Sequence, residues 1–205
     1  MKSWVGVAVL LAGAATSSAS QNVEITPVGG YRFGGSLNIQ EASSGLGVQD
    51  AGAFGLHLGV KVSPDGELEA LFVRQDTRLK ANDGLFSSTA LFGLKLDTYQ
   101  LGGSYLFREE DEKVRPYIGL GMGITRLIPE PSDLESETRF SASIAGGVKA
   151  YVGAHLGFRL ELRGFFTVID SESRIFCSPG LPCVVKTKGS DISQAEIRGG
   201  VIFRF

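Results

Sequence analysis

A two-residue alternation of apolar and polar side chains recurs along most of this chain, and it constrains the fold more than any other feature. Along residues 156–168 the apolar side chains take one face, and Arg159 and Glu161 take the other. Residues 140–152 and 195–205 repeat the pattern. A period of two places successive side chains on opposite faces of a β-strand, whereas an amphipathic helix has a period of 3.6. The sequence therefore predicts an all-β protein.

Eight segments carry the alternation, and we expect each to form one strand. They are residues 23–35, 51–62, 66–75, 94–107, 114–127, 140–152, 156–168 and 195–205. Their connections alternate in length. The short ones lie at 64–66, 108–113 and 153–154, and the long polar ones lie at about 36–50, 76–92, 128–138 and 170–190. An up-and-down antiparallel meander would place the short turns and both chain ends on one side, and four long loops on the other.

Composition excludes several other classes of protein. The 205 residues include 28 glycines, about twice the usual share. Each glycine inside a helix costs about 1 kcal/mol relative to alanine, which argues against a helical bundle. A formal net charge of -2 gives no reason to expect nucleic acid as a partner. No apolar stretch reaches the roughly 18 residues of a membrane helix, and two cysteines with two histidines do not suggest a zinc site. We expect no metal, no cofactor and no catalytic residue.

The N-terminal residues have the three-part form of a secretory signal peptide. Lys2 precedes an apolar run from Trp4 to Ala15, and small residues follow up to Ser20. We expect residues 1–20 to be a cleavable signal peptide. No linker or change in composition divides residues 21–205, so we expect them to form one domain.

Cys177 and Cys183 lie in the last long connection, with Pro179, Gly180 and Pro182 between them. Export places them in an oxidising compartment, where cysteines this close in sequence form disulfides. We therefore expect a disulfide that closes a small loop, with a stabilising effect on the order of 2 kcal/mol.

Alternation alone does not decide whether the apolar face points inward or outward. A soluble lipocalin-like barrel has eight strands and an apolar ligand cavity, and it stays open as an alternative. Several features favour an apolar face turned outward to lipid. Glycine, serine, alanine and threonine separate the charges of the polar face, which suits a narrow interior, and the loop lengths follow the rule for outer-membrane barrels. The chain ends on a strand with Val201, Phe203 and Phe205 on its apolar face.

The charges of the polar face have both signs, so they could pair inside a closed barrel. We expect a lumen charge network formed by Glu24, Arg32, Lys61, Glu67, Glu69, Arg139, Lys149, Arg159, Glu161, Arg163, Glu196, Arg198 and Arg204. Isolated charges in a closed lumen would each cost several kcal/mol. The neighbouring charges of the last two strands should therefore form one mixed-sign network.

The terminal GGVIFRF, the RPYIGLGMGI run from Arg115 to Ile124 and the eight-strand layout resemble the small outer-membrane β-barrel family, which includes OmpA-like transmembrane domains and opacity-type proteins. The resemblance implies an eight-stranded antiparallel up-and-down transmembrane β-barrel in the outer membrane of a Gram-negative bacterium. It also implies that Phe203 and Phe205 act as an assembly signal for the barrel-assembly machinery. Since no residue follows Phe205, we do not expect the peptidoglycan-binding domain of some relatives. We expect the barrel to be surrounded by outer-membrane lipid and to be a monomer.

Three functions follow from this architecture. The first is a structural or surface-interaction protein that presents four extracellular loops, because an eight-stranded barrel is just wide enough for side chains to fill. The second is a narrow pore, which needs the inner-face glycines, such as Gly119 and Gly121, to leave a continuous gap. The third, an enzyme, is disfavoured because His57 lies mid-strand on the inner face and His155 lies in a short turn. We expect the acidic loop 128–138 to be a solvated loop.

Overall fold

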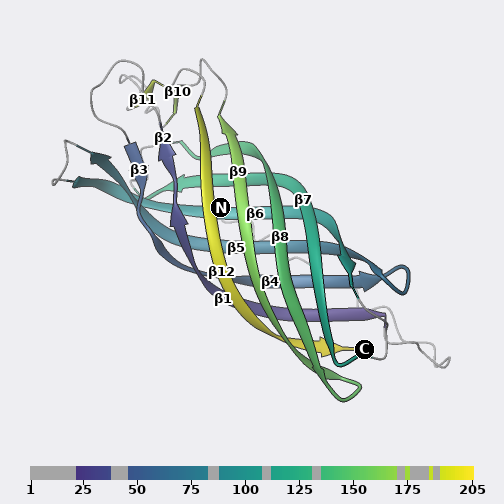
Figure 1. The fold of residues 1–205 in the computed structure, drawn as a ribbon. Coiled ribbons are helices and arrows are strands. Elements are labelled where there is room, and N and C mark those ends of the chain that lie inside the picture. Colours follow the sequence, from purple (N-terminus) through teal and green to yellow (C-terminus); the bar gives the residue numbers. More distant parts are fainter. Residues whose placement is uncertain are drawn as a thin grey trace, which may run out of the picture.

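The computed structural model describes residues 22–37, 46–82, 88–107, 112–130, 135–169, 174–175, 185–186 and 190–205. Eight long antiparallel strands form the wall of a closed barrel (Figure 1). They are β1 (Val23–Gly34), β4 (Ala51–Lys61), β5 (Gly66–Asn82), β6 (Ser88–Leu106), β7 (Val114–Pro129), β8 (Glu137–Val152), β9 (Leu156–Ile169) and β12 (Ser190–Arg204). The predicted eight-stranded antiparallel barrel is confirmed. Among the described residues, no helix is long and apolar enough to cross a membrane.

Each wall strand pairs with the wall strands that precede and follow it along the chain, as β1 does with β4 and β5 does with β6. The pairing of the first wall strand, β1, with the last, β12, closes the barrel. At the seam, the Phe205 amide donates to the Val23 carbonyl at 2.9 Å, and the Val23 amide donates to the Phe205 carbonyl at 3.3 Å. Closure pairs each of the eight wall strands on both sides, which a barrel in lipid requires because hydrocarbon offers no hydrogen bonds.

Four short strands lie at the end of the barrel where the long connections are. They are β2 (Ser36–Leu37), β3 (Leu46–Val48), β10 (Arg174–Ile175) and β11 (Val185–Lys186). β3 pairs with β5 beyond the start of β4, and β2 pairs with β3. β1 is interrupted before β2 at Gly34 and Gly35, whose φ angles of 79° and 113° favour glycine. We call this end the long-connection end and the other the short-turn end.

The predicted limits of the long loops were wrong at several points, because the strands continue into them. β5 and β6 stay paired as far as Asn82 and Ser88, inside the segment 76–92 assigned to a loop. β7 runs to Pro129 and β8 begins at Glu137. Outside the apolar band the pattern inverts while the backbone ladder continues. The inward side chains there include Leu79, Leu94 and Leu127, which are buried, and the outward ones, such as Arg78 and Arg126, are polar. Hydropathy therefore marks the membrane-facing part of these strands rather than their full length.

The apolar face of every wall strand points outward. Leu101, Leu120 and Leu160 are each more than 60% exposed, and Phe54 and Phe140 are more than half exposed. Aromatic side chains gather towards both ends of this apolar surface. They include the pairs Tyr31–Phe33 and Phe72–Tyr99 on one side and Tyr105–Phe107 on the other, with ring centroids 4.9, 5.0 and 5.3 Å apart. An apolar band between two aromatic belts is the outer surface of a transmembrane barrel.

The interior is not polar throughout. Ala53, Leu71, Val73 and Phe165 form a buried apolar cluster inside the barrel, each at most 5% exposed. The alternation gave no sign of this cluster, because these residues interrupt an otherwise polar face. The interior is thus divided into layers of different polarity.

Candidate functional site

The centre of the lumen is organised around Glu161, a carboxylate on β9 that pairs with three arginines. Because side chains two apart on a strand share a face, Arg159 and Arg163 point into the lumen beside it, with N···O distances of 2.6 and 2.7 Å. Arg198 comes from β12, where it lies directly opposite Glu161 in the strand register, and it forms a third ion pair. All four residues are at most 3% exposed. This arrangement joins two neighbouring strands on the inner face of the wall.

Glu69 on β5 extends this centre to the opposite wall of the barrel. Its carboxylate pairs with Arg159 at 2.9 Å and with Arg163 at 3.3 Å. The Tyr117 hydroxyl donates to Glu161 at 2.5 Å, and the Arg159 guanidinium lies 4.5 Å from the centre of the Tyr117 ring. Salt bridges therefore cross the lumen, where hydrogen bonds of the sheet cannot reach.

Towards the long-connection end, Arg32 and Glu196 form the next layer. They lie opposite one another on β1 and β12 and pair at 2.7 Å. Glu196 also lies 3.7 Å from Arg198, which connects this layer to the centre. The Arg32 guanidinium stacks 4.0 Å above the Phe165 ring, so the buried apolar cluster covers the charged layers on this side.

Towards the short-turn end, Lys149 on β8 holds two carboxylates. Its ammonium lies 2.7 Å from Glu24 and 2.5 Å from Glu67. Glu24 also accepts a hydrogen bond from the Tyr151 hydroxyl at 2.8 Å and pairs with Arg204 at 3.1 Å. The Arg204 guanidinium lies 3.8 Å from the centre of the Tyr151 ring. This layer fills the lumen next to the short turns.

We call these side chains together the lumen network. Its members are Glu24, Arg32, Glu67, Glu69, Lys149, Arg159, Glu161, Arg163, Glu196, Arg198 and Arg204. Two further residues assigned to it from the sequence lie at its ends. Lys61 lines the mouth at the short-turn end. Arg139 pairs with Glu137 on its own strand at 3.1 Å, near the long-connection end.

Sequence reasoning missed Tyr117, Tyr151 and Arg115 as interior residues. Tyr117 and Tyr151 are at most 9% exposed, and both donate to network carboxylates. Arg115 is 3% exposed and donates to the Pro64 carbonyl at 2.8 Å. The alternation carried the needed signal, since all three lie in phase with the inward positions of β7 and β8. Tyrosine counts as apolar in such a pattern, so its polar hydroxyl went unnoticed.

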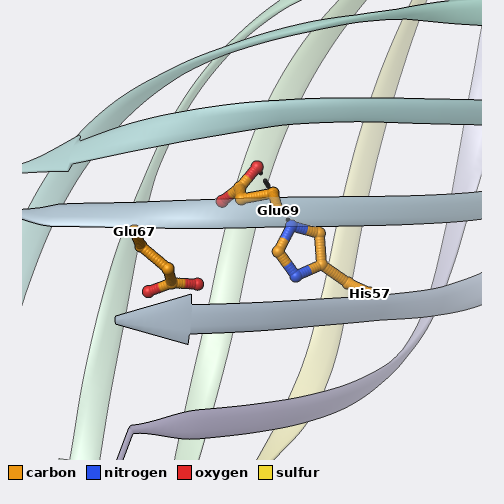
Figure 2. A group of neighbouring side chains, drawn as sticks. All are labelled: His57, Glu67 and Glu69. Atoms are coloured by element: carbon orange, nitrogen blue, oxygen red, sulfur yellow. Dashed lines mark ion pairs between the residues drawn. The ribbon is translucent and has the colours of Figure 1, made fainter. Parts of the chain in front are cut away.

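Three potential metal ligands meet inside the barrel, namely His57 on β4 and Glu67 and Glu69 on β5 (Figure 2). One ligand atom from each lies within 4.8 Å of the others. His57 Nε2 lies 3.1 Å from Glu69, as the dashed line shows. Both carboxylates already pair with cations, Glu67 with Lys149 and Glu69 with Arg159. The protein's own side chains therefore supply the positive charge that a metal ion would bring.

Little free space remains along the network. A gap at the short-turn mouth, lined by Glu24, Lys61 and Arg204 among others, has a volume of about 20 Å³. That is room for about one water molecule. Further along, the Gln100 side chain accepts a hydrogen bond from the Ser143 hydroxyl at 2.6 Å and donates one to the Ser141 hydroxyl at 3.1 Å. Side chains from opposite walls therefore contact one another across the described lumen.

An outward apolar band, two aromatic belts and a charged interior define a transmembrane β-barrel of the outer-membrane class. Residues 5–205 match the family model described as outer membrane protein beta-barrel domain, and the chain belongs to this family. It is an outer-membrane protein of the Gram-negative type. In barrels of this class the short turns are periplasmic and the long connections face the outside. A comparison with curated protein sequences finds no match.

Solved structures of small outer-membrane barrels share the fold. Neisserial surface protein A is 14% identical, with a TM-score of 0.59 over 89% of this chain and 97% of its own. OprG from Pseudomonas aeruginosa is 12% identical, with a TM-score of 0.61 over 90% and 97%. AlkL, determined in lipid bilayers, is 13% identical, with a TM-score of 0.56 over 95% of each chain. At these identities the likeness concerns the fold alone.

Two predicted features lie outside the described residues. They are the signal peptide, residues 1–20, and the disulfide between Cys177 and Cys183. Phe203 and Phe205, the predicted assembly signal, are exposed on the outer face at the periplasmic end.

Proposed function

We propose that this protein is a closed, non-conducting outer-membrane barrel that acts as a structural or surface-interaction protein through its four extracellular connections. The observation that carries the proposal is the cross-lumen arrangement of Glu161 and Glu69 with Arg159 and Arg163. A solute crossing the barrel would have to break ion pairs that are buried from all sides. Removing one partner of a buried pair typically costs about 3–5 kcal/mol, so such an opening would be rare.

Catalysis is not part of the proposal. His57, at 0% exposed, is enclosed between Glu69 and Arg159, where no substrate reaches it. His155 lies in the β8–β9 turn on the periplasmic side, with Nδ1 3.1 Å from the Arg204 carbonyl. Neither histidine lies beside a nucleophile near the outer leaflet, as lipid-modifying chemistry would need. The extracellular connections are therefore the part of the protein to which we assign the function.

Ion conductance tests the closed lumen. Purified protein reconstituted in a planar lipid bilayer should give no steady conductance at moderate voltage. As a positive control, a variant in which Glu69 and Arg159 are both alanine loses a complementary pair without leaving either charge alone, and it should conduct if it folds. Steady single-channel conductance of the wild-type protein would replace the proposal with the narrow pore.

The role of the connections can be tested without knowing their ligand. Replacing residues 38–45, 83–87, 131–134 and 176–184 with short Gly-Ser linkers should leave the barrel folded, as judged by its heat-modifiable migration on gels, because the wall strands lie outside these segments. Binding of the protein to the surface of whole cells or to extracellular matrix should then fall with the linkers in place. Unchanged binding would leave only the structural role.

We also propose recognition by the barrel-assembly machinery through the last strand, with a monomer as the mature state. The exposed Phe203 and Phe205 at the seam between β12 and β1 support this proposal. Analytical ultracentrifugation in a density-matched detergent checks the monomer, and a concentration-dependent dimer would contradict it.

A further inference from the structure

The outer face of the barrel carries an apolar hollow of about 430 Å³ over β4, β5, β6 and β7. It lies at the row where Leu58, Ala70, Leu101 and Met122 are in register on neighbouring strands. Ala70 has a single methyl group where its neighbours carry long side chains, so the outer surface is indented there. A depression of this kind in the lipid-facing wall can take a hydrocarbon chain.

A cationic row lies just beyond the extracellular edge of this hollow. Phe72 and Tyr99 form the next row in register, and Arg74, Asp97 and Arg126 form the row after that. Arg74 donates to both oxygens of Asp97, at 2.7 and 2.6 Å. The Asp97 side chain is 4% exposed and that of Arg74 is 39% exposed. The carboxylate is therefore covered and orients the guanidinium, while positive charge faces outward.

The depth of this row coincides with the expected boundary of the hydrocarbon. Outward residues of β7 are apolar from Val114 to Ile124, and Arg126 is the next. Ten steps of about 3.3 Å, tilted by roughly 40°, span about 25 Å, which is the height of the apolar band of an outer-membrane barrel. Arg74 and Arg126 thus lie at the level of the lipid headgroups in the outer leaflet.

The opposite side of the barrel differs. A second hollow, of about 600 Å³, lies on the outer face beside Gly29 and Gly199. On the described parts of β1, β9 and β12, the outward residues towards the outside include Val168, Ser193 and Asp191, and none is basic. Of the two hollows, the one at Ala70 is therefore the one that adjoins positive charge among the described residues.

We propose that this sector binds one phosphorylated lipid of the outer leaflet, with an acyl chain in the hollow at Ala70 and the phosphate at Arg74 and Arg126. Arginine suits phosphate because its planar N–H groups donate in pairs. Asp97 takes two of the donors of Arg74 and leaves its remaining N–H groups for the headgroup. The site joins a headgroup contact to a chain contact, so it selects a lipid over a free anion.

Native mass spectrometry of the detergent-solubilised protein can test both halves of the site. The probes are phosphatidic acid and the phosphate-free diacylglycerol with identical acyl chains, and inorganic phosphate serves as competitor. Wild-type protein should prefer phosphatidic acid, and the double variant R74Q/R126Q should lose roughly tenfold in affinity for it while binding diacylglycerol unchanged. Ala70→Leu should weaken both lipids, because it fills the hollow.

Matched controls separate a defined site from general attraction. Arg78→Gln, on the same strand but further from the hollow, and Ala195→Leu, an outward alanine on the opposite side, should each change affinity less than twofold. Equal loss with Arg78→Gln would show diffuse electrostatic attraction and overturn the site. Full competition by inorganic phosphate, or no preference between the two lipids, would also overturn it. Heat-modifiable migration of every variant verifies that the barrels are folded.

Discussion

At the scale of single residues, charge pairing inside the lumen governs this protein. Glu161 forms ion pairs with three arginines, two from its own strand and one from β12. A buried ion pair is weak evidence for stability by itself, because desolvation offsets the attraction. Removing only one partner of the pair is strongly destabilising, because the remaining charge stays buried in the closed barrel. The network therefore acts mainly by making partial disruption costly.

Glu161→Ala should lower the free energy of unfolding by about 3–5 kcal/mol, because it leaves Arg159, Arg163 and Arg198 without their shared carboxylate. Urea unfolding of the protein in lipid vesicles, with the folded fraction measured by heat-modifiable migration on gels, gives the loss of stability. Glu135→Ala is the control, since Glu135 is exposed outside β8 and its removal should change stability by less than about 0.5 kcal/mol. Equal stability of the two variants would indicate a hydrated lumen.

At the scale of the strands and turns, backbone geometry decides where the meander reverses. The β8–β9 turn has Gly153 at φ 80°, in the region that side chains disfavour. Gly146, on the outer face of β8, has no positive φ, and a Cβ there would meet no atom within 4 Å. The two glycines therefore serve different purposes.

Gly153→Ala should destabilise the barrel by about 1 kcal/mol, whereas Gly146→Ala should stabilise it by about 0.5 kcal/mol, because glycine in a strand loses more conformational freedom on folding. The same urea unfolding assay measures both. Changes of the same sign would show that side-chain packing against lipid, rather than backbone conformation, determines the effect at these positions.

The last strand combines closure of the barrel with the proposed assembly signal. Deleting Phe205 removes two backbone hydrogen bonds to Val23 and an exposed aromatic ring, and it should strongly reduce recovery in the outer membrane. Phe205→Ala keeps the backbone bonds, so a loss nearly as large would identify the ring as the signal. Phe166→Ala, at the extracellular end of β9, should assemble normally. A defect for the deletion alone would leave only closure of the seam.

At the scale of the whole molecule, we expect the wall to fold independently of the long connections and of the predicted signal peptide. Mass spectrometry of exported protein without reductant should find a chain trimmed near Gln21 and no free thiol at Cys177 or Cys183. The double variant C177S/C183S should still give a folded barrel, because the closed hydrogen-bonded ladder is complete without the loop. A free thiol would contradict the disulfide, and failure to fold would show that the loop supports the wall.

Much of this architecture could be predicted from the sequence because it depends on a local period. Alternation along residues 156–168 or 195–205 assigns each side chain to a face without knowledge of its neighbours, and the polar face it gives is the interior that the structure describes. The inward position of Arg159 and Glu161 is of this kind. Loop limits were predicted less well, since the ladder of β5 and β6 continues where the apolar face changes from outward to inward.

Which charges meet was decided only by the tertiary structure. Register between strands sets Arg198 opposite Glu161, and closure of the barrel brings Glu69 on β5 to Arg159 on β9, 90 residues away along the chain. The same register places Arg74 and Arg126 on either side of Asp97 above the hollow at Ala70. A period of two fixes the face of a side chain, but it contains no information on strand offset or on the partner across the lumen. Those depend on backbone hydrogen bonds summed over the closed barrel, which no single strand specifies.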